Sequence, residues 1–218
     1  MRFIFFSCFP FSKIELKNKI KENQEKQALK SCLDELITLF HDSKELSLSN
    51  GTTVSVILLN EKKQKVWIEN IGDSTCVLYR RSKDPLILTE MHQLSNPLEF
   101  ERVKQSGAKI DDRYIIHPDD EGLEWPKVIQ LTRTVGDLEF SSRAGIIHQP
   151  FETEVDIVSD DQYLVLASDG LWDLISPKDL MGLLDGSPQD CLNKIQEAIE
   201  NNFEYIPDDI GLVIKKLN

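Results

Sequence analysis

The hydrophobic period of the chain changes after Asn50-Gly51, and this change constrains the fold more than any other feature. Residues 53–59 and 65–71 are β-branched and aliphatic runs, and the polar residues 60–64 separate them. Two such runs joined by a short polar link are typical of an antiparallel hairpin. The sequence therefore predicts an antiparallel sheet at the centre of the fold.

Further apolar runs extend this sheet. A third strand is predicted over Thr75 to Tyr79, and the sheet is expected to continue through residues 86–88, 114–116 and 128–131. The run from Tyr163 to Ala167 is short, apolar and bounded by a turn, so it predicts a buried strand. A last strand is expected over Ile210 to Ile214.

Helices are predicted on either side of these strands in the sequence. The lysine- and glutamate-rich stretch from Ile14 to about His41 indicates an amphipathic helix, because its apolar residues recur at helical spacing: Leu29, Leu33, Leu36, Ile37 and Phe40. Another helix is expected from about Pro97 to Ser106, stopped by Gly107. Ser176-Pro177 and Ser187-Pro188 each combine an N-cap hydroxyl with proline at the first helical position. No repeat or low-complexity linker divides the chain, which favours one α+β domain.

The net charge and the cysteine pattern limit which partners and which kinds of metal or disulfide site the chain is expected to have. The chain has 218 residues, and its formal net charge of −12 makes nucleic acid and anionic membranes unsuitable partners. Its four cysteines are scattered and form no C-x-x-C pair, so neither a zinc cluster nor a disulfide framework is predicted. A reducing cytoplasmic or nuclear setting is expected.

The N-terminus, MRFIFFSCFPFS, is short and apolar. It is interrupted by Pro10 and is shorter than the roughly 18 apolar residues of a membrane span, so a transmembrane segment is excluded. A secretory signal, a first strand and a misassigned start of the chain stay open. The absence of a clear small-residue cleavage site favours the last two.

Carboxylates at strand ends indicate a metal site. Asp169 directly follows the strand predicted at 163–167, and Asp208 and Asp209 directly precede the last strand. Side chains at the ends of two strands can meet on one rim of a sheet, and oxygen ligands without nearby His or Cys favour magnesium, manganese or calcium over zinc. Asp137 lies near Arg133 in the sequence, and this pair is expected to position backbone.

Six segments, taken in order, resemble the motifs of the metal-dependent serine/threonine protein phosphatases of type 2C, the PPM family. They are SNGTTVSVILL, IENIGDSTCVLYR, LTEMHQLSNPLEFERVKQSGAKI, LTRTVGDLEF, LVLASDGLWDLIS and DDIGLVI. The resemblance covers roughly Asn50 to Leu217. It implies a four-layer αββα sandwich, two packed antiparallel sheets flanked by helices, with the first strands missing or altered.

The resemblance also implies a function and its residues. Asp169 and Asp208 match residues that bind the two bridged divalent cations of the family, Mg²⁺ or Mn²⁺, and Asp173 matches an acidic residue near an additional cation. The implied reaction is hydrolysis of phosphoserine or phosphothreonine in a protein by metal-activated water. A monomer is expected, with a divergent segment over residues 1–20 and a single phosphatase-like domain over 21–218.

The chain departs from the family pattern at several positions. Residues 1–50 contain no DGHGG metal motif, Met91 stands in place of the acidic residue of the LTxDH motif, and Thr75 replaces the arginine of GDSR. In the closing strand, Asp209 and Gly211 replace Asn and Thr. These departures predict a weak or partial metal site and poor or absent hydrolysis.

Two other classes are weighed against this enzyme. The first is a pseudophosphatase that keeps the fold and binds phosphoproteins as an interaction or scaffold module. The second is a phosphatase of the haloacid-dehalogenase type, which the segment SDG faintly resembles. That class needs a nucleophilic Asp two residues before Asp169, where this chain has Ala167.

Overall fold

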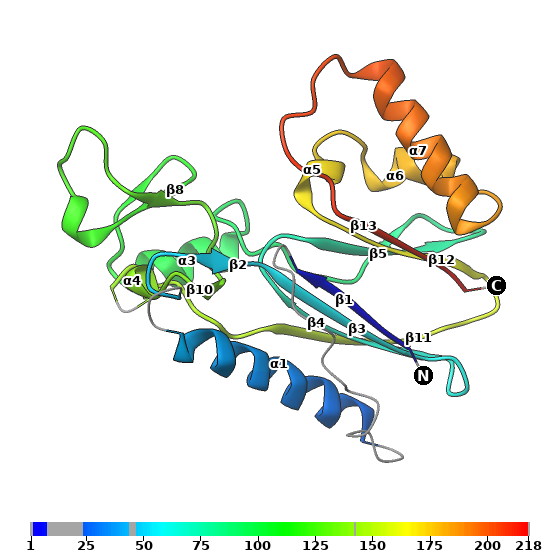
Figure 1. Ribbon diagram of the computed structural model, residues 1–218, viewed down its shortest axis with the longest axis horizontal. Helices are drawn as coiled ribbons and strands as arrows, with labels where there is room; N and C mark the ends of the chain where they lie inside the picture. Colours follow the sequence, from blue (N-terminus) through cyan, green and yellow to red (C-terminus); the bar gives the residue numbers. More distant parts are fainter. Residues whose placement is uncertain (1, 8–23, 44–46, 142, 218) are drawn as a thin grey trace.

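Two antiparallel four-stranded sheets stack face to face at the centre of the computed structural model (Figure 1). The structure describes residues 2–7, 24–43, 47–141 and 143–217. Helix α1 (Glu25–Asp42) covers the outer face of one sheet, and α6 (Pro177–Leu180) and α7 (Pro188–Asn202) lie over the other sheet. The order of layers is helix, sheet, sheet, helix, which confirms the predicted αββα sandwich.

The first sheet contains the predicted hairpin. Val54 pairs with Ile71 at one end of the hairpin and Asn60 with Lys65 at the other. In spatial order, its strands are β1 (Arg2–Ser7), β3 (Val54–Asn60), β4 (Lys65–Ile71) and β11 (Phe151–Asp156). Strand β1 pairs antiparallel with β3, so the segment Arg2–Ser7 forms a first strand. The boundary predicted at residue 20 stays a prediction.

The second sheet carries the strand that was predicted over 163–167. In spatial order, its strands are β13 (Leu212–Lys216), β12 (Asp161–Ala167), β5 (Thr75–Arg80) and β6 (Leu86–Ile87). The closing strand begins at Leu212, two residues later than predicted. The short elements α5 (Asp169–Trp172) and η3 (Met181–Leu183) follow β12.

Three apolar clusters hold the four layers together. The cluster between the two sheets joins β3 and β4 to β5 and β12, with Ile57, Ile68, Leu78 and Leu166 fully or almost fully buried. A second cluster lies between α1 and the first sheet, and a third lies between the second sheet and α6 and α7. Each buried aliphatic side chain contributes about 1.5–3 kcal/mol relative to an exposed one.

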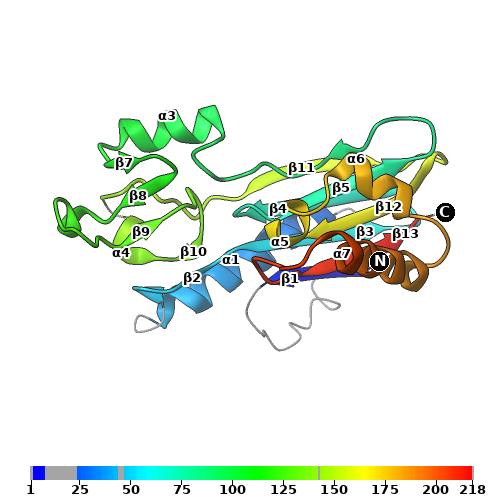
Figure 2. The ribbon, with the colours of Figure 1, turned by 90° about the horizontal axis from the view of Figure 1, so that it is seen from above.

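A smaller lobe lies at one end of the sandwich (Figure 2). It contains a separate three-stranded sheet and two helices: β7 (Ile110–Asp111), β8 (Tyr114–Ile116), β9 (Val128–Ile129), α3 (Pro97–Gln105) and α4 (Leu138–Ser141). The turn η2 (Pro118–Asp120) connects β8 to the strand that follows. The predicted continuation of one sheet through residues 86–88, 114–116 and 128–131 was therefore wrong. The first run belongs to the second sheet, and the other two form the lobe.

Local sequence signals explain where the helices begin. Ser187 caps α7 with a full capping box, in which its hydroxyl accepts the Asp190 N–H and the Asp190 carboxylate accepts the Ser187 N–H. Ser176 caps α6 in a similar way, but α6 has only four residues before the chain tightens into η3. Helix α3 begins at Pro97 as predicted, and Gly107, at φ +83°, follows its last turn. No helix of the described residues is long and apolar enough to cross a membrane.

A buried carboxyl without a hydrogen-bond partner lies under α1. Glu69 of β4 is 2% exposed, and neither of its carboxyl oxygens has a partner among the described residues. It lies directly across from Glu152 of β11, which forms ion pairs with Lys26 and Lys30 of α1. Burial, and then the charge of Glu152, raise the pKa of Glu69 to about 7.

We predict that Glu69 makes the stability of the domain fall as the pH rises from about 4.5 to about 7. The folded chain holds the Glu69 proton more tightly than the unfolded chain, so its contribution is complete at low pH and is lost as the pH passes the folded pKa. The loss should be about 3 kcal/mol at most. Urea unfolding of Glu69→Gln at pH 5 and pH 8 should show a smaller difference in unfolding free energy than the native chain shows. Glu101→Gln, on the exposed surface of α3, should leave that difference unchanged. An identical pH dependence in the native and Glu69→Gln chains would contradict the prediction.

Candidate functional site

The ends of the central strands of the second sheet bring two aspartates to one rim of the sandwich. Strand β5 begins at Thr75, two residues after Asp73, and β12 ends at Ala167, two residues before Asp169. Thr75 and Ala167 pair directly across the sheet. This register places Asp73 and Asp169 at the same rim.

The segment before β13 is fastened beside Asp169 by Ser168. The Ser168 hydroxyl donates to the Asp209 carbonyl oxygen at 3.2 Å and accepts the Gly211 N–H at 2.9 Å. The Ser168 N–H also donates to the Gly211 carbonyl at 3.0 Å. These bonds bring Asp208 to the rim that holds Asp169, as the sequence predicted.

Gly170 allows this close approach. A Cβ atom at position 170 would overlap the carbonyl oxygen of Asp209 and would lie only 3.0 Å from the carbonyl carbon of Asp209. The glycine of the Asp169-Gly170 pair is therefore required because the backbone of the next loop lies directly against it. Trp172 fixes the other side of α5, since its indole N–H donates to the carbonyls of Thr75 and Ala167.

The rim is strongly negative. Burial raises the pKa of the Asp169 carboxyl, and the nearby charges of Asp208 and Asp173 raise it further. Burial also raises the pKa of Asp73; the hydrogen bond from Gln93 opposes this shift, and the charges of Asp169 and Asp173 add to it. A cation would relieve this repulsion between like charges.

A loop from the lobe side holds Asp73 in place. The Gln93 amide donates to the Asp73 carboxylate at 2.6 Å. His92 is fully buried, and its Nδ1 accepts the Gly72 N–H at 3.0 Å while its backbone N–H donates to the Gly72 carbonyl. Burial and the charge of Arg133 lower the pKa of His92 to about 4. His92 therefore supports the loop in its neutral form.

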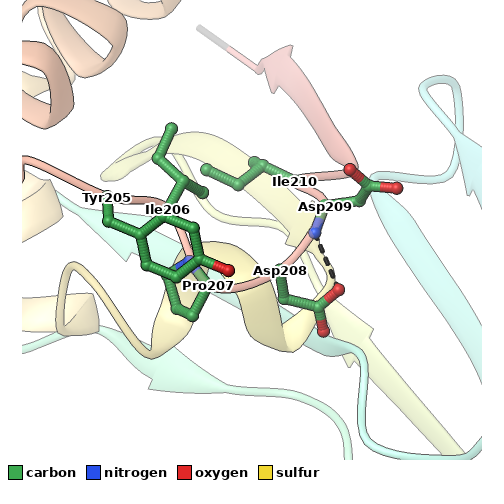
Figure 3. Close-up of a pocket in the computed structure, with 6 residues that line it drawn as sticks. All are labelled: Tyr205, Ile206, Pro207, Asp208, Asp209 and Ile210. Atoms are coloured by element: carbon green, nitrogen blue, oxygen red, sulfur yellow. Dashed lines mark hydrogen bonds between the residues drawn. The ribbon is translucent and has the colours of Figure 1, made fainter.

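An open pocket lies at the end of this rim (Figure 3). It has a volume of about 530 Å³, and the residues that line it are Tyr205, Ile206, Pro207, Asp208, Asp209 and Ile210. The Asp208 carboxylate accepts the Asp209 N–H at 2.7 Å, which fixes its orientation in the loop. One of the predicted metal ligands thus lines an open hollow.

The donor atoms of the rim suit a hard cation, but their number is small. Asp73, Asp169, Asp173 and Asp208 offer carboxylate oxygens, the ligands that Mg²⁺ and Mn²⁺ prefer. Among the described residues, however, no three His, Cys, Asp or Glu side chains lie close enough together to hold a metal ion. The residues therefore fit a divalent cation in chemical type, and they fall short of the set that a binuclear centre needs.

Strand β1 reaches the same rim without an acidic residue. Its last residue, Ser7, pairs with Val54 of β3, which pairs in turn with Ile71 of β4, so β1 ends level with the strand that leads to Asp73, with β3 between them. The first acidic residue after Ser7 is Glu15. Residues 8–14, which directly follow β1 in the sequence, therefore include no carboxylate.

Arg133 has a different partner from the one predicted. Its guanidinium pairs with Glu99 of α3 at 2.6 Å, so the expected pair with Asp137 was wrong. Arg102 and Thr132 also donate to Glu99. Burial disfavours the charged carboxylate, but these hydrogen bonds outweigh it and lower the pKa of Glu99 to about 2. The network ties α3 to the chain segment that runs from the lobe into β10 (Val135–Gly136), which pairs with β2 (Gly51–Thr52).

Comparison with known proteins identifies the family of this domain. A family model described as "Protein phosphatase 2C" matches residues 10–202. The chain belongs to the protein phosphatase 2C family. The match covers the rim residues Asp73, Asp169 and Asp173, and the predicted family is confirmed.

Curated relatives agree with this assignment. The chain is 36% identical over 126 residues to "Protein phosphatase 2C homolog 1" of Saccharomyces cerevisiae, and this match covers 58% of the chain and 40% of the yeast protein. It is 30% identical over 188 residues to "Protein kinase and PP2C-like domain-containing protein" of Oryza sativa, covering 83% of the chain and 26% of the rice protein. The chain thus spans less than half the length of these two relatives.

Solved structures share the fold. "Structure of a C.elegans sex determining protein" matches 94% of the chain and 50% of that protein, with a TM-score of 0.71 and 22% identity. The "serine-threonine phosphatase 2C from Toxoplasma gondii" matches 88% of the chain and 65% of that protein, with a TM-score of 0.68 and 19% identity. At these identities, the likeness concerns the fold of a protein phosphatase 2C domain.

Asp73 is the rim residue that was not selected from the sequence. In the sequence, Asp73 lies in the Gly72-Asp73-Ser74 link between two predicted strands and within the family-like segment IENIGDSTCVLYR. The structure also shows where two residues that depart from the family motifs lie. Met91 is exposed in an irregular segment, and Thr75 is buried, with its hydroxyl donating to the Asp73 carbonyl at 3.3 Å. The charges of Asp208 and Asp173 act on Asp169 and raise its pKa. The role of these three residues as metal ligands stays a prediction.

We predict that Gly170→Ala destabilises the domain by about 1–3 kcal/mol, because its methyl group would displace the Asp208-Asp209 backbone. Denaturant unfolding measures this change. Gly182→Ala is the matched control, since no atom lies within 4 Å of a Cβ built at position 182. That variant should unfold at the same denaturant concentration as the native chain or slightly above it. Equal stability of the two variants would contradict the close approach at Gly170.

Proposed function

We propose that this protein phosphatase 2C domain holds a divalent cation, Mg²⁺ or Mn²⁺, in a partial site and hydrolyses phosphoserine or phosphothreonine in proteins only poorly. The observation that carries the proposal is the rim itself. Strand β12 and the loop before β13 bring Asp169 and Asp208 to one rim, while β1 ends at the same rim and residues 8–14, which follow it in the sequence, include no carboxylate.

Each rim residue has a defined task in this proposal. Asp169 and Asp208, with Asp173 beside them, would hold the cation through carboxylate oxygens. Asp73, oriented by Gln93, adds negative charge at the same rim. When bound, the cation would lower the pKa of a water molecule and neutralise charge on a phosphoryl group. Coordination of Mg²⁺ or Mn²⁺ takes about six oxygens, so a site with so few protein ligands should bind weakly.

The small number of positively charged side chains acting on the described rim residues also favours slow turnover. The charged groups that act most strongly on Asp169 and Asp73 are other carboxylates. Arg133, the arginine of the LTRTVGD motif, is engaged by Glu99 and by the Gln149 carbonyl. A phosphoryl dianion approaching this rim would therefore depend on the bound cation for charge compensation.

A second function in the same class of domain is binding without turnover. A pseudophosphatase would use the rim and the neighbouring surface to bind a phosphoprotein as an interaction or scaffold module. The absence of a carboxylate directly after β1 is the observation that favours this alternative. An intracellular monomer suits both functions and is part of the proposal.

We predict weak binding of Mn²⁺ with a stoichiometry near one ion per chain. Isothermal calorimetry of the native chain should give a dissociation constant near or above the millimolar range, and Asp169→Asn should abolish the heat of binding because it removes a central charge of the rim. Asp111→Asn, an exposed aspartate of the lobe, serves as the control and should bind Mn²⁺ like the native chain.

Hydrolysis is measured in parallel with a phosphothreonine peptide and millimolar Mn²⁺. Slow phosphate release that Asp169→Asn removes supports the proposed enzyme. No release, together with peptide binding, supports the interaction module. Tight binding of two ions per chain with rapid turnover would overturn the proposal of a partial site.

A further inference from the structure

The pocket beside Asp208 carries an exposed aromatic side chain that the proposed chemistry does not use. Tyr205 is 76% exposed, although tyrosine side chains gain most when they are buried. Its neighbours Ile206 and Pro207 are also exposed and line the same pocket. Exposed tyrosines next to a hollow are frequent anchors in protein recognition.

The orientation of these side chains relates the pocket to the rim. In Figure 3, the Tyr205 ring and the Asp208 carboxylate extend to one side of the segment, and Ile206 extends to the other. Asp208 is three positions after Tyr205 in the sequence, a span of at most about 10 Å. Two or three residues of an extended peptide cover the same distance. A ligand residue held at Asp208 therefore has its near neighbours within reach of Tyr205.

The negative charge of the pocket favours a ligand that carries positive charge. Asp208 and Asp209 line it, Glu204 precedes it, and all three side chains are exposed. No lysine or arginine is among the residues that line the pocket. The chain as a whole carries a formal net charge of −12. Charge complementarity therefore favours a basic ligand segment, and Tyr205 favours one with an apolar side chain.

We propose that the pocket formed by Tyr205–Ile210 binds the flanking residues of a phosphorylated protein segment, with an apolar residue two or three positions from the phosphoresidue and a basic residue next to it. The apolar side chain packs on the Tyr205 ring, and the basic side chain pairs with Asp209 or Glu204. This inference rests on the proposed function, because it assigns the phosphoresidue to the rim that contains Asp208. It makes Tyr205 a residue that determines specificity.

Fluorescence anisotropy with labelled peptides tests this assignment. The probes are a phosphothreonine peptide with Leu two residues and Arg three residues after the phosphothreonine, the same peptide with Leu replaced by Ser, the same peptide with Arg replaced by Glu, and the unphosphorylated parent. We expect the first peptide to bind the native chain roughly tenfold more tightly than the Ser or Glu peptides. Equal affinity of the first three peptides would overturn the proposal.

Variants then connect the selectivity to the pocket. Tyr205→Ala should remove most of the difference between the Leu and Ser peptides, while Tyr205→Phe should keep it, since the ring supplies the contact. Leu39→Ala is the matched control, because Leu39 is 59% exposed on α1, at the opposite face of the sandwich. A similar loss of affinity for the Leu and Ser peptides in Tyr205→Ala would show that the ring does not contact the apolar residue, and would overturn the proposal.

Repeating the titrations with EDTA separates this inference from the proposed function. Without metal, the unphosphorylated parent should still bind more tightly than an unphosphorylated peptide in which Ser replaces Leu, by a smaller factor than the phosphopeptides show, because the Tyr205 contact needs no cation. Persistent selectivity with no Mn²⁺ binding refutes the metal site alone. Mn²⁺ binding and hydrolysis with no selectivity refute the pocket alone. Self-association that depends on Tyr205, seen by size-exclusion chromatography, would assign the pocket to a second copy of the chain and overturn the proposal.

Discussion

The face-to-face packing of the two sheets is the constraint on which the rest of the structure depends. Buried aliphatic side chains of β3 and β4 meet those of β5 and β12, and this contact fixes where each strand ends. Because Ile71, Thr75 and Ala167 come to one end of the sandwich, the link between β4 and β5 and the loop after β12 share a rim. The apolar core thereby gathers polar residues that are far apart in the sequence, and it does so without using them for its own stability.

The rim itself is held by contacts that are independent of its charges. Ser168 fastens the segment before β13 through backbone atoms, Gly170 leaves room for that segment, and Trp172 bonds to two carbonyls at the strand ends. The carboxylates of Asp73 and Asp169 contribute mutual repulsion. The contacts that shape the rim are therefore different from the carboxylates that would bind a cation. The rim would keep its shape if some of those carboxylates were replaced.

The sequence predicted the parts of the fold that depend on local periodicity. The hairpin of β3 and β4, helix α3 and the capped start of α7 were all predicted within a residue or two, because turn and capping residues mark them directly. It did not predict β11, whose alternation of exposed and half-buried residues, as in FETEVD, gives little apolar signal. It also assigned β8 and β9 to the main sheet, because sheet membership is decided by long-range pairing.

The residues of the candidate site divide in the same way, into those that local sequence signals mark and those that only long-range pairing brings together. Asp169 and Asp208 were selected because each lies next to a predicted strand, and the structure brings them to one rim. Asp73 was missed because a Gly-Asp-Ser link is a common turn, and only the pairing of Thr75 with Ala167 shows that this turn faces Asp169. The partner of Arg133 was missed for a related reason: Glu99 lies 34 residues away and meets it through the packing of α3.

The fate of a phosphoryl group at this rim depends on how its negative charge is balanced. Repulsion between Asp73, Asp169 and their neighbours is a cost that a well-occupied metal centre removes, and a partial centre removes only in part. Strand β1 ends at the rim, and residues 8–14, which follow it in the sequence, include no Asp or Glu. In the proposed partial site, the domain would still present a phosphorylated segment, while less positive charge would be available to stabilise the transition state for hydrolysis. Loss of metal-ligating carboxylates from such a rim should therefore reduce hydrolysis more than it reduces binding of a phosphorylated segment.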